Sequence, residues 1–158
     1  MHKNLIPILI LAVSVMAGCA GTTAQVQSDF RLAAGEKLNL KLATPSTMSD
    51  QGVTIFRERL KTQLTSSGLL AANADKSVRT LDVGVTTYDM RHGAARALAG
   101  IFAGTDKMLS TIKINDAVSG NVVSEFVVES KNPTAWGTSK GLIEDHADKI
   151  VETLQNGK

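Results

Sequence analysis

Two histidines, His92 and His146, are the side chains best suited to acid–base chemistry beyond the first few residues of this chain. Asp89 lies three residues before His92, and two acidic residues directly precede His146, but no nucleophile stands beside either histidine. Ser119 is outside the G-x-S-x-G pattern of a nucleophile elbow. A general base without a nucleophile does not make a catalytic set. We therefore expect both histidines to be surface or packing residues, and the protein not to be an enzyme.

Metal and nucleic-acid chemistry have little support in the sequence. No H-E-x-x-H, H-x-H or cysteine cluster offers a set of transition-metal ligands, and only one of the 158 residues is cysteine. The formal net charge of +2 is too small for the dense basic face that phosphate contacts need. The 43% hydrophobic and 20% charged residues are typical of a folded globular domain. We expect no metal, no cofactor and no nucleic-acid partner.

The first 18 residues have the organisation of a secretory signal. Residues 1–3 are positively charged, residues 5–16 form an almost unbroken apolar run, and small residues follow. The run is well short of the roughly 20 apolar residues that span a bilayer, so no transmembrane helix is expected. The single cysteine, Cys19, stands where a signal peptidase would cut.

The sequence Ala17-Gly18-Cys19 resembles the lipobox of bacterial lipoproteins, with Met16 where most lipoboxes have leucine. The resemblance implies cleavage before Cys19 and acyl chains on its sulfur and new amino group. Several acyl chains hold a protein durably on a membrane, because each buried CH₂ contributes about 0.8 kcal/mol. Ala20, in place of aspartate, implies sorting to the outer membrane with the domain facing the periplasm. The alternative is an ordinary secreted protein in which Cys19 has no special role.

After the signal peptide of residues 1–18, the mature chain divides into a linker and one domain. Residues 20–28 are small and polar without an apolar period, so residues 19–28 are predicted to be the lipidated cysteine and a flexible tether. Residues 29–158 are predicted to form a single periplasmic domain, a length that can bury an independent core.

Apolar periodicity predicts six elements in that domain. Leucine at every second position predicts a strand over 37–43, and spacings of three and four predict a helix over 50–67. Three further strands and a final helix are predicted over residues 79–90, 107–117, 121–129 and 139–154. A Ser-Gly-Asn turn joins the last two strands, and the strand–helix–strand order implies a parallel first pair. The expected fold is α+β, a mixed sheet of about four strands (β-α-β-β-β-α) with both helices on one face.

Residues 93–104 are rich in glycine and alanine, and the turn sequence Asp-Ala-Val-Ser-Gly-Asn-Val follows at 116–122. Together they resemble a family of Gram-negative outer-membrane lipoproteins described only as a domain of unknown function. The resemblance covers roughly residues 29–154. The order of elements is more distantly similar to the TolB amino-terminal and LpoB-type periplasmic domains, which are non-enzymatic docking modules. That second likeness is an analogy of fold.

The Gly/Ala-rich segment has two interpretations. As a contact surface it would use apolar anchors, with arginines that reach acidic groups of a partner or lipid head groups. As ordinary structure, it would pack on the domain's own sheet. The single tryptophan is an anchor for a partner or glycan, or a cap on the sheet edge or core. The candidate sites are lipidation at Cys19 and partner contacts at Arg91, Arg96, Ile101, Phe102 and Trp136.

The sequence thus predicts a lipid-anchored, non-enzymatic envelope protein whose periplasmic domain binds another envelope protein. A module that binds a small ligand or a glycan such as peptidoglycan is the alternative. A hydrolase that uses His92 or His146 is a third reading, for which no accompanying sequence set is visible.

Overall fold

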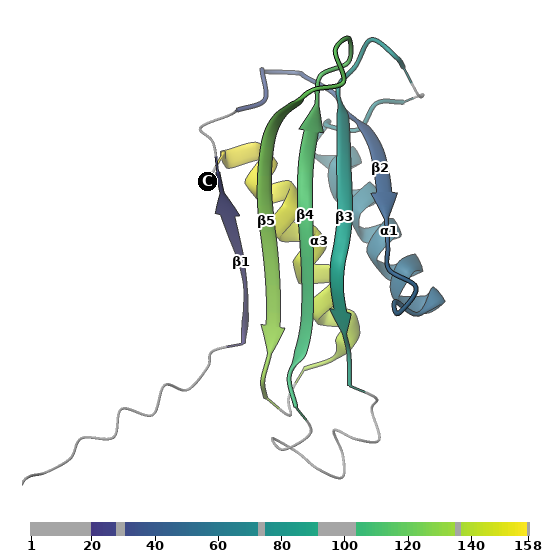
Figure 1. Cartoon of the computed structure of the whole chain (residues 1–158), viewed down its shortest axis with the longest axis vertical. Helices are drawn as coiled ribbons and strands as arrows, with labels where there is room; N and C mark the ends of the chain where they lie inside the picture. Colours follow the sequence, from purple (N-terminus) through teal and green to yellow (C-terminus); the bar gives the residue numbers. More distant parts are fainter. Residues whose placement is uncertain (1–19, 28–30, 73–74, 92–103, 135–136, 158) are drawn as a thin grey trace, which may run out of the picture.

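The computed structural model describes residues 20–27, 31–72, 75–91, 104–134 and 137–157. Within these residues five strands form one sheet in the order β1-β5-β4-β3-β2, and two helices lie on one of its faces (Figure 1). The elements are β1 Gly21–Val26, β2 Asn39–Ala43, α1 Asp50–Ser66, β3 Thr80–Asp89, β4 Asp106–Asn115, β5 Val122–Asn132 and α3 Ser139–Asn156. The α+β class, the mixed sheet and the two helices are confirmed.

The strand β1 corrects two predictions. Residues 21–26, expected in a flexible tether, pair antiparallel with β5, so the sheet has five strands and not four. The folded domain therefore begins by Gly21, well before residue 29. The long neighbouring strand β5 supplies the hydrogen-bond partners of β1. The short polar sequence of β1 does not predict a strand by itself.

The predicted strand pairs are present. β2 and β3 are parallel, as expected for two strands joined through α1, and β4 and β5 form the antiparallel hairpin. The sheet has two ends, which we name by the residues there. At the "Ala20 end" lie Ala20, the end of β3, the start of β4 and the end of β5, because Asp89, Lys107, Lys131 and Gly21 are aligned across the sheet. The "hairpin end" holds the β4–β5 turn at 116–121.

The core lies between the sheet and the two helices. Phe56, Leu60 and Leu64 of α1 are fully buried, and so is Ile150 of α3. The inner face of each long strand alternates with its outer face, which produces the two-residue period that the sequence shows. Each helix begins at a side-chain cap, Ser49 for α1 and Thr138 for α3.

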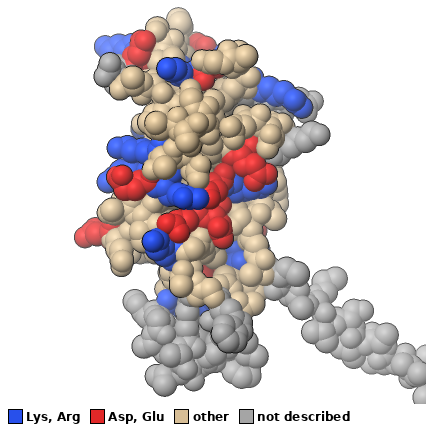
Figure 2. Space-filling model, turned by 180° about the vertical axis from the view of Figure 1, so that it is seen from behind, with Lys and Arg blue, Asp and Glu red and all other residues tan. Residues whose placement is uncertain are grey.

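The helix surface carries charges of both signs, as the view from behind shows (Figure 2). Arg59 of α1 and Asp148 of α3 form a two-point ion pair there, with Nε 2.7 Å from Oδ1 and Nη2 2.6 Å from Oδ2. The hydrogen bond to Asp148 raises the pKa of Arg59. Within the described residues no helix is long and apolar enough to cross a membrane.

A β-bulge changes the direction of the last side chains of β3. The pairing of β3 with β4 shifts between Val85 and Thr87, so Tyr88 is opposite the buried Met108 and faces the helices. Gly52, near the start of α1, accommodates the tyrosine. A Cβ at Gly52 would lie 2.6 Å from the Tyr88 hydroxyl.

Candidate functional site

The described residues next to the predicted site residues lie at the Ala20 end of the sheet. Ala20 directly follows Cys19, Arg91 and Gly104 flank residues 92–103, and Thr134 and Gly137 flank residues 135–136. Cys19, Arg96, Ile101, Phe102 and Trp136 themselves lie outside the described residues. The described flanks of all three candidate segments therefore lie at one end of the sheet.

Arg91 joins two of these segments through a buried hydrogen-bond network. Its guanidinium donates from Nη1 to the Gly104 carbonyl at 2.7 Å and from Nη2 to the Thr134 carbonyl at 2.8 Å. Nη2 is also 2.8 Å from the carbonyl oxygen of Asn132, the last residue of β5. Arg91 thus holds the ends of both flanking segments against the end of β5.

Asp106 balances the charge of Arg91. Its carboxylate is fully buried and accepts from the Arg91 backbone N–H at 2.8 Å and from Nε at 3.0 Å. The Arg91 side chain is only 5% exposed. Both charges of a buried ion pair have to be present, because a lone buried charge is strongly unfavourable. The described geometry therefore gives Arg91 an internal, structural role and does not support the partner contact predicted for it from the sequence.

A cleft of about 370 Å³ opens beside this network. Its lining combines polar and apolar groups from the start of β1, the end of β5 and the first two turns of α3, including Ala20, Lys131, Thr138 and Asp145. Ala20, the residue that follows Cys19 in the sequence, forms part of its wall.

His146 lies in the core. The ring nitrogens are each 2.8 Å from a serine hydroxyl: Nδ1 from Ser130 on β5 and Nε2 from Ser110 on β4. Thr22 of β1 extends the chain, with its hydroxyl 2.8 Å from that of Ser130. His146, Ser110 and Ser130 are fully buried, and burial lowers the pKa of His146 to about 3. His146 is a neutral packing residue, as predicted, whereas His92 lies outside the described residues.

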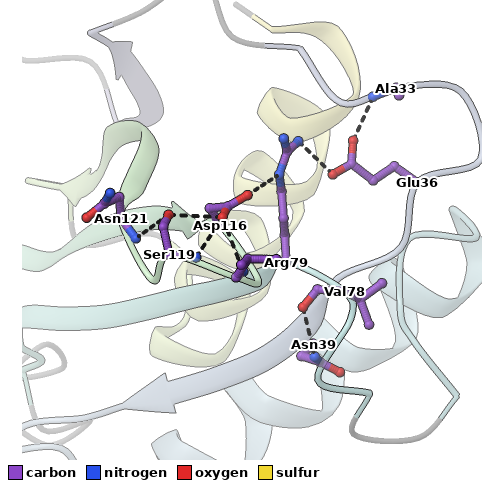
Figure 3. Close-up of polar contacts among 9 residues, drawn as sticks. Ala33, Glu36, Asn39, Val78, Arg79, Asp116, Ser119 and Asn121 are labelled. Carbon is purple, nitrogen blue, oxygen red and sulfur yellow. Dashed lines mark hydrogen bonds and ion pairs between the residues drawn. The ribbon is translucent and has the colours of Figure 1, made fainter.

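The hairpin end holds a second group of polar contacts (Figure 3). Asp116 Oδ1 accepts from the Ser119 backbone N–H at 2.9 Å, from its hydroxyl at 2.9 Å and from the Val118 N–H at 3.2 Å. These bonds lower the pKa of Asp116. Gly120 has a φ of +70°, which favours glycine. The Asp-Ala-Val-Ser-Gly sequence thus forms the turn itself. The hydrogen bonds within the turn and its positive φ account for the aspartate, the serine and the glycine.

Arg79 connects this turn to the segment before β2. Its Nη1 donates to Glu36 Oε1 at 2.9 Å, and its Nε is 4.0 Å from Asp116 Oδ2 (Figure 3). A cleft of about 670 Å³ lies at this end, lined by residues that include Asn39, Lys41, Asp82 and Asn115. No group of three or more metal-ligating side chains occurs in the part of the chain that the structure describes.

Comparisons with known proteins give one family and a shared fold. The domain of unknown function DUF4410 matches residues 19–135, and no curated protein matches the chain. The PelC dodecamer from Paraburkholderia phytofirmans, in space group P6, has a TM-score of 0.62 and is 16% identical, over 85% of this chain and 99% of that chain. A variant of the same dodecamer, in space group C2, has a TM-score of 0.59 at 16% identity, over 87% of this chain and 100% of that chain. A lipoprotein candidate from Caulobacter crescentus CB15 is 18% identical, over 72% of this chain and 86% of that chain, with a TM-score of 0.42.

Proposed function

The chain belongs to the DUF4410 family of domains of unknown function, and from that premise we propose that it is a lipid-anchored, non-enzymatic protein of the cell envelope. Its acyl chains would sit on Cys19 in the outer membrane. Its periplasmic domain would bind another envelope protein. The observation that supports this most is the position of β1, which begins at Gly21, two residues after the lipobox cysteine.

This position has a direct consequence for the anchored protein. One residue adds at most about 3.8 Å between Cα atoms, so acyl chains on Cys19 would hold the Ala20 end against the bilayer. The hairpin end would project away from the membrane by roughly the length of β4, about 33 Å for its 10 residues. The anchored domain would thus present its sheet to a partner at a fixed height, without the slack of a tether.

The chemistry of the core supports a binding role over a hydrolytic one. The imidazole of His146 is fully buried, and the pKa that burial gives it keeps the ring neutral between two serines. A general base has to reach the proton that it abstracts, and this ring has no exposed surface. The outer face of the sheet, in contrast, displays cross-strand ion pairs such as Lys113 with Glu125 and Lys107 with Glu129.

Further copies of the chain are the partner that the fold favours. The structures that share this fold at TM-scores of 0.59 and 0.62 are of a dodecamer. We propose that this chain also assembles with itself on the membrane surface. Cross-linking in membranes followed by size analysis tests this directly, and a chain that stays monomeric at native abundance would count against it.

The anchor is tested by a Cys19→Ala variant followed through cell fractionation. The wild-type chain should be in the outer-membrane fraction, with a mass at residue 19 that includes acyl groups, and the variant should leave that fraction. An Ala20→Ser variant is the matched control, because it retains the cysteine. An unmodified Cys19 in the native protein would overturn the proposed function.

A glycan-binding role is the second candidate, and the cleft at the hairpin end favours it. Amide and carboxylate side chains such as Asn39, Asn115 and Asp82 line this cleft, and such groups suit hydroxyl-rich ligands. Thermal shift with soluble peptidoglycan fragments distinguishes this role, since stabilisation by a fragment supports it and an unchanged melting temperature at saturating fragment concentration contradicts it.

A further inference from the structure

The two edge strands, β1 and β2, each have backbone groups that pair with no other strand among the described residues. Directly after β1, the Gln27 N–H donates to the Glu125 carbonyl at 3.3 Å. In an antiparallel ladder every second residue bonds to its neighbour, so Gly21, Thr23 and Gln25 bond to β5. The N–H and C=O groups of the alternate residues therefore point away from the sheet; these are Thr22, Ala24 and Val26.

The opposite edge has a shorter open stretch. The Asn39 N–H donates to the Arg79 carbonyl at 2.9 Å, so Asn39, Lys41 and Ala43 bond to β3. The backbone N–H and C=O groups of Leu40 and Leu42 therefore point away from the sheet. Beyond them, Leu38 is already paired with the segment around Leu70, which closes the edge toward the hairpin end.

Natural edge strands are usually protected by charge, proline or a covering segment. The sequence of β1, Gly-Thr-Thr-Ala-Gln-Val, has no charge and no proline. Within the described residues, no other strand pairs with the outer edge of β1. Ala24 and Val26 at this edge, and Leu40 and Leu42 at the other, are half-buried apolar residues packed against the core. Both edges would lose apolar exposure if another strand covered them.

We propose that β1 of one copy pairs antiparallel with β2 of the next copy, so that the sheet continues from copy to copy. This inference rests on the proposed lipid anchor, because the anchor selects among the possible pairings. It names the interface through which the proposed self-assembly would occur.

The directions of the two edge strands decide which pairing is compatible with the anchor. β1 runs from the Ala20 end to the hairpin end, and β2 runs the opposite way (Figure 1). A symmetric antiparallel pair of two β1 strands would place the two Ala20 ends at opposite poles. Two such copies could not both be acylated into one membrane surface. Pairing β1 with a neighbour's β2 is antiparallel while every Ala20 end points the same way.

The same pairing keeps the layers of the fold continuous. At both edges, the residues whose backbone groups point outward have their side chains on the helix side of the sheet. Ala24 and Leu42, for example, lie on the strand face that packs on the core. A joined sheet would therefore have all its helices on one face. An interface of two different surfaces repeats from copy to copy, and it closes into a ring when the rotation between copies allows.

Two cysteines on the outer sheet face report this pairing. Gln25 and Lys41 are both exposed on that face, and the proposed pairing brings Gln25 of one copy near Lys41 of its neighbour. The full-length, acylated double variant Gln25→Cys/Lys41→Cys, treated in membranes with a short bismaleimide, should give a ladder of covalent multimers. Neither single variant should cross-link, because the two edges of one copy are a sheet width apart. An Arg57→Cys/Thr62→Cys chain, with both thiols exposed on α1, is the matched control and should remain monomeric.

A proline variant gives an independent readout. Proline is tolerated on an edge strand where its missing N–H faces outward, so Ala24→Pro should retain the fold. In the double-cysteine background it should reduce the ladder by about fivefold to tenfold, which is the loss expected from one broken backbone hydrogen bond. A ladder that is unchanged by Ala24→Pro, in a chain whose circular dichroism is native, overturns the edge pairing.

The outcomes separate this inference from the anchor. Intact mass of the same samples reports acylation. An acylated chain that gives no ladder, or a Gln25→Cys single variant that forms dimers, overturns the edge pairing and leaves the anchor standing. A ladder from an unacylated chain overturns the anchor and supports the edge pairing by itself.

Discussion

Arg91 and Asp106 lie on opposite sides of the Gly/Ala-rich segment in the sequence, yet Nε of the arginine is 3.0 Å from a carboxylate oxygen of the aspartate. Both side chains are buried, and the arginine also holds the Gly104 and Thr134 carbonyls. One ion pair therefore fixes where the candidate segments leave the sheet.

Arg91→Ala should destabilise the fold by about 3–5 kcal/mol, because it leaves the Asp106 carboxylate buried and uncompensated. Urea denaturation measures the change in the free energy of unfolding. Lys140→Ala, at an ion pair whose lysine is 65% exposed, is the control and should change stability by less than about 1 kcal/mol. Equal stabilities of the two variants would contradict the role assigned to Arg91.

Acid should destabilise the protein through His146. Its pKa is near 6.5 in the unfolded chain and about 3 in the folded one, so the unfolded state binds the proton more readily as pH falls. Stability from this group is fully present above pH 6.5 and is lost between about pH 6.5 and 3, by up to roughly 1.4 kcal/mol per pH unit.

A His146→Gln variant isolates this effect from the protonation of carboxylates. Its free energy of unfolding, measured from pH 7 to pH 4, should fall less steeply than that of the wild type. Parallel pH profiles for the two proteins would show that the histidine is not the group responsible.

Gly52→Ala should destabilise the domain, although alanine usually favours a helix over glycine. The new Cβ would meet the Tyr88 hydroxyl at 2.6 Å and its ring at 3.1 Å, and overpacking of this kind costs about 1–3 kcal/mol. Thermal unfolding measures the loss. Combination with Tyr88→Leu should restore most of it, and a double variant no better than the sum of its parts would argue against the clash.

Thr22→Val should loosen β1 without unfolding the core. The substitution removes the 2.8 Å contact between the Thr22 and Ser130 hydroxyls but retains the shape of the side chain. Hydrogen exchange at the β1 amides that bond to β5 should accelerate, while exchange in α1 should not change. The exposed Thr23, next in the same strand, provides the control variant Thr23→Val. Exchange rates in β1 that are equal for wild type and Thr22→Val would refute the coupling.

The strands predicted from alternation are those whose inner residues are large. Leu81, Val83 and Ile112 are buried and their strand neighbours are not, so burial itself produces the two-residue period. The sequence pattern did not predict β1 because its inner residues, among them Thr22 and Ala24, are small. Its existence depends on β5, a partner that lies about a hundred residues away in sequence, and local pattern does not report such pairing.

The candidate site was predictable in its segments but not in its geometry. The sequence predicted contact residues within 91–102 and at 136, which stays a prediction, and the structure places the described flanks of these segments together. The pairing of Arg91 with Asp106, and the burial of Ser110 and Ser130 around His146, depend on which strands are neighbours. Sequence periodicity does not contain that information.

If Cys19 carries acyl chains as proposed, the two-residue spacing between it and the start of β1 constrains how the protein travels between membranes. An acylated chain has to be shielded from water on its way to another membrane, and a carrier that encloses the fatty chains would meet the folded body only two residues later. Such a carrier would have to stay open toward the sheet end that contains Ala20 and Lys131, or else separate β1 from β5 before it binds the chain.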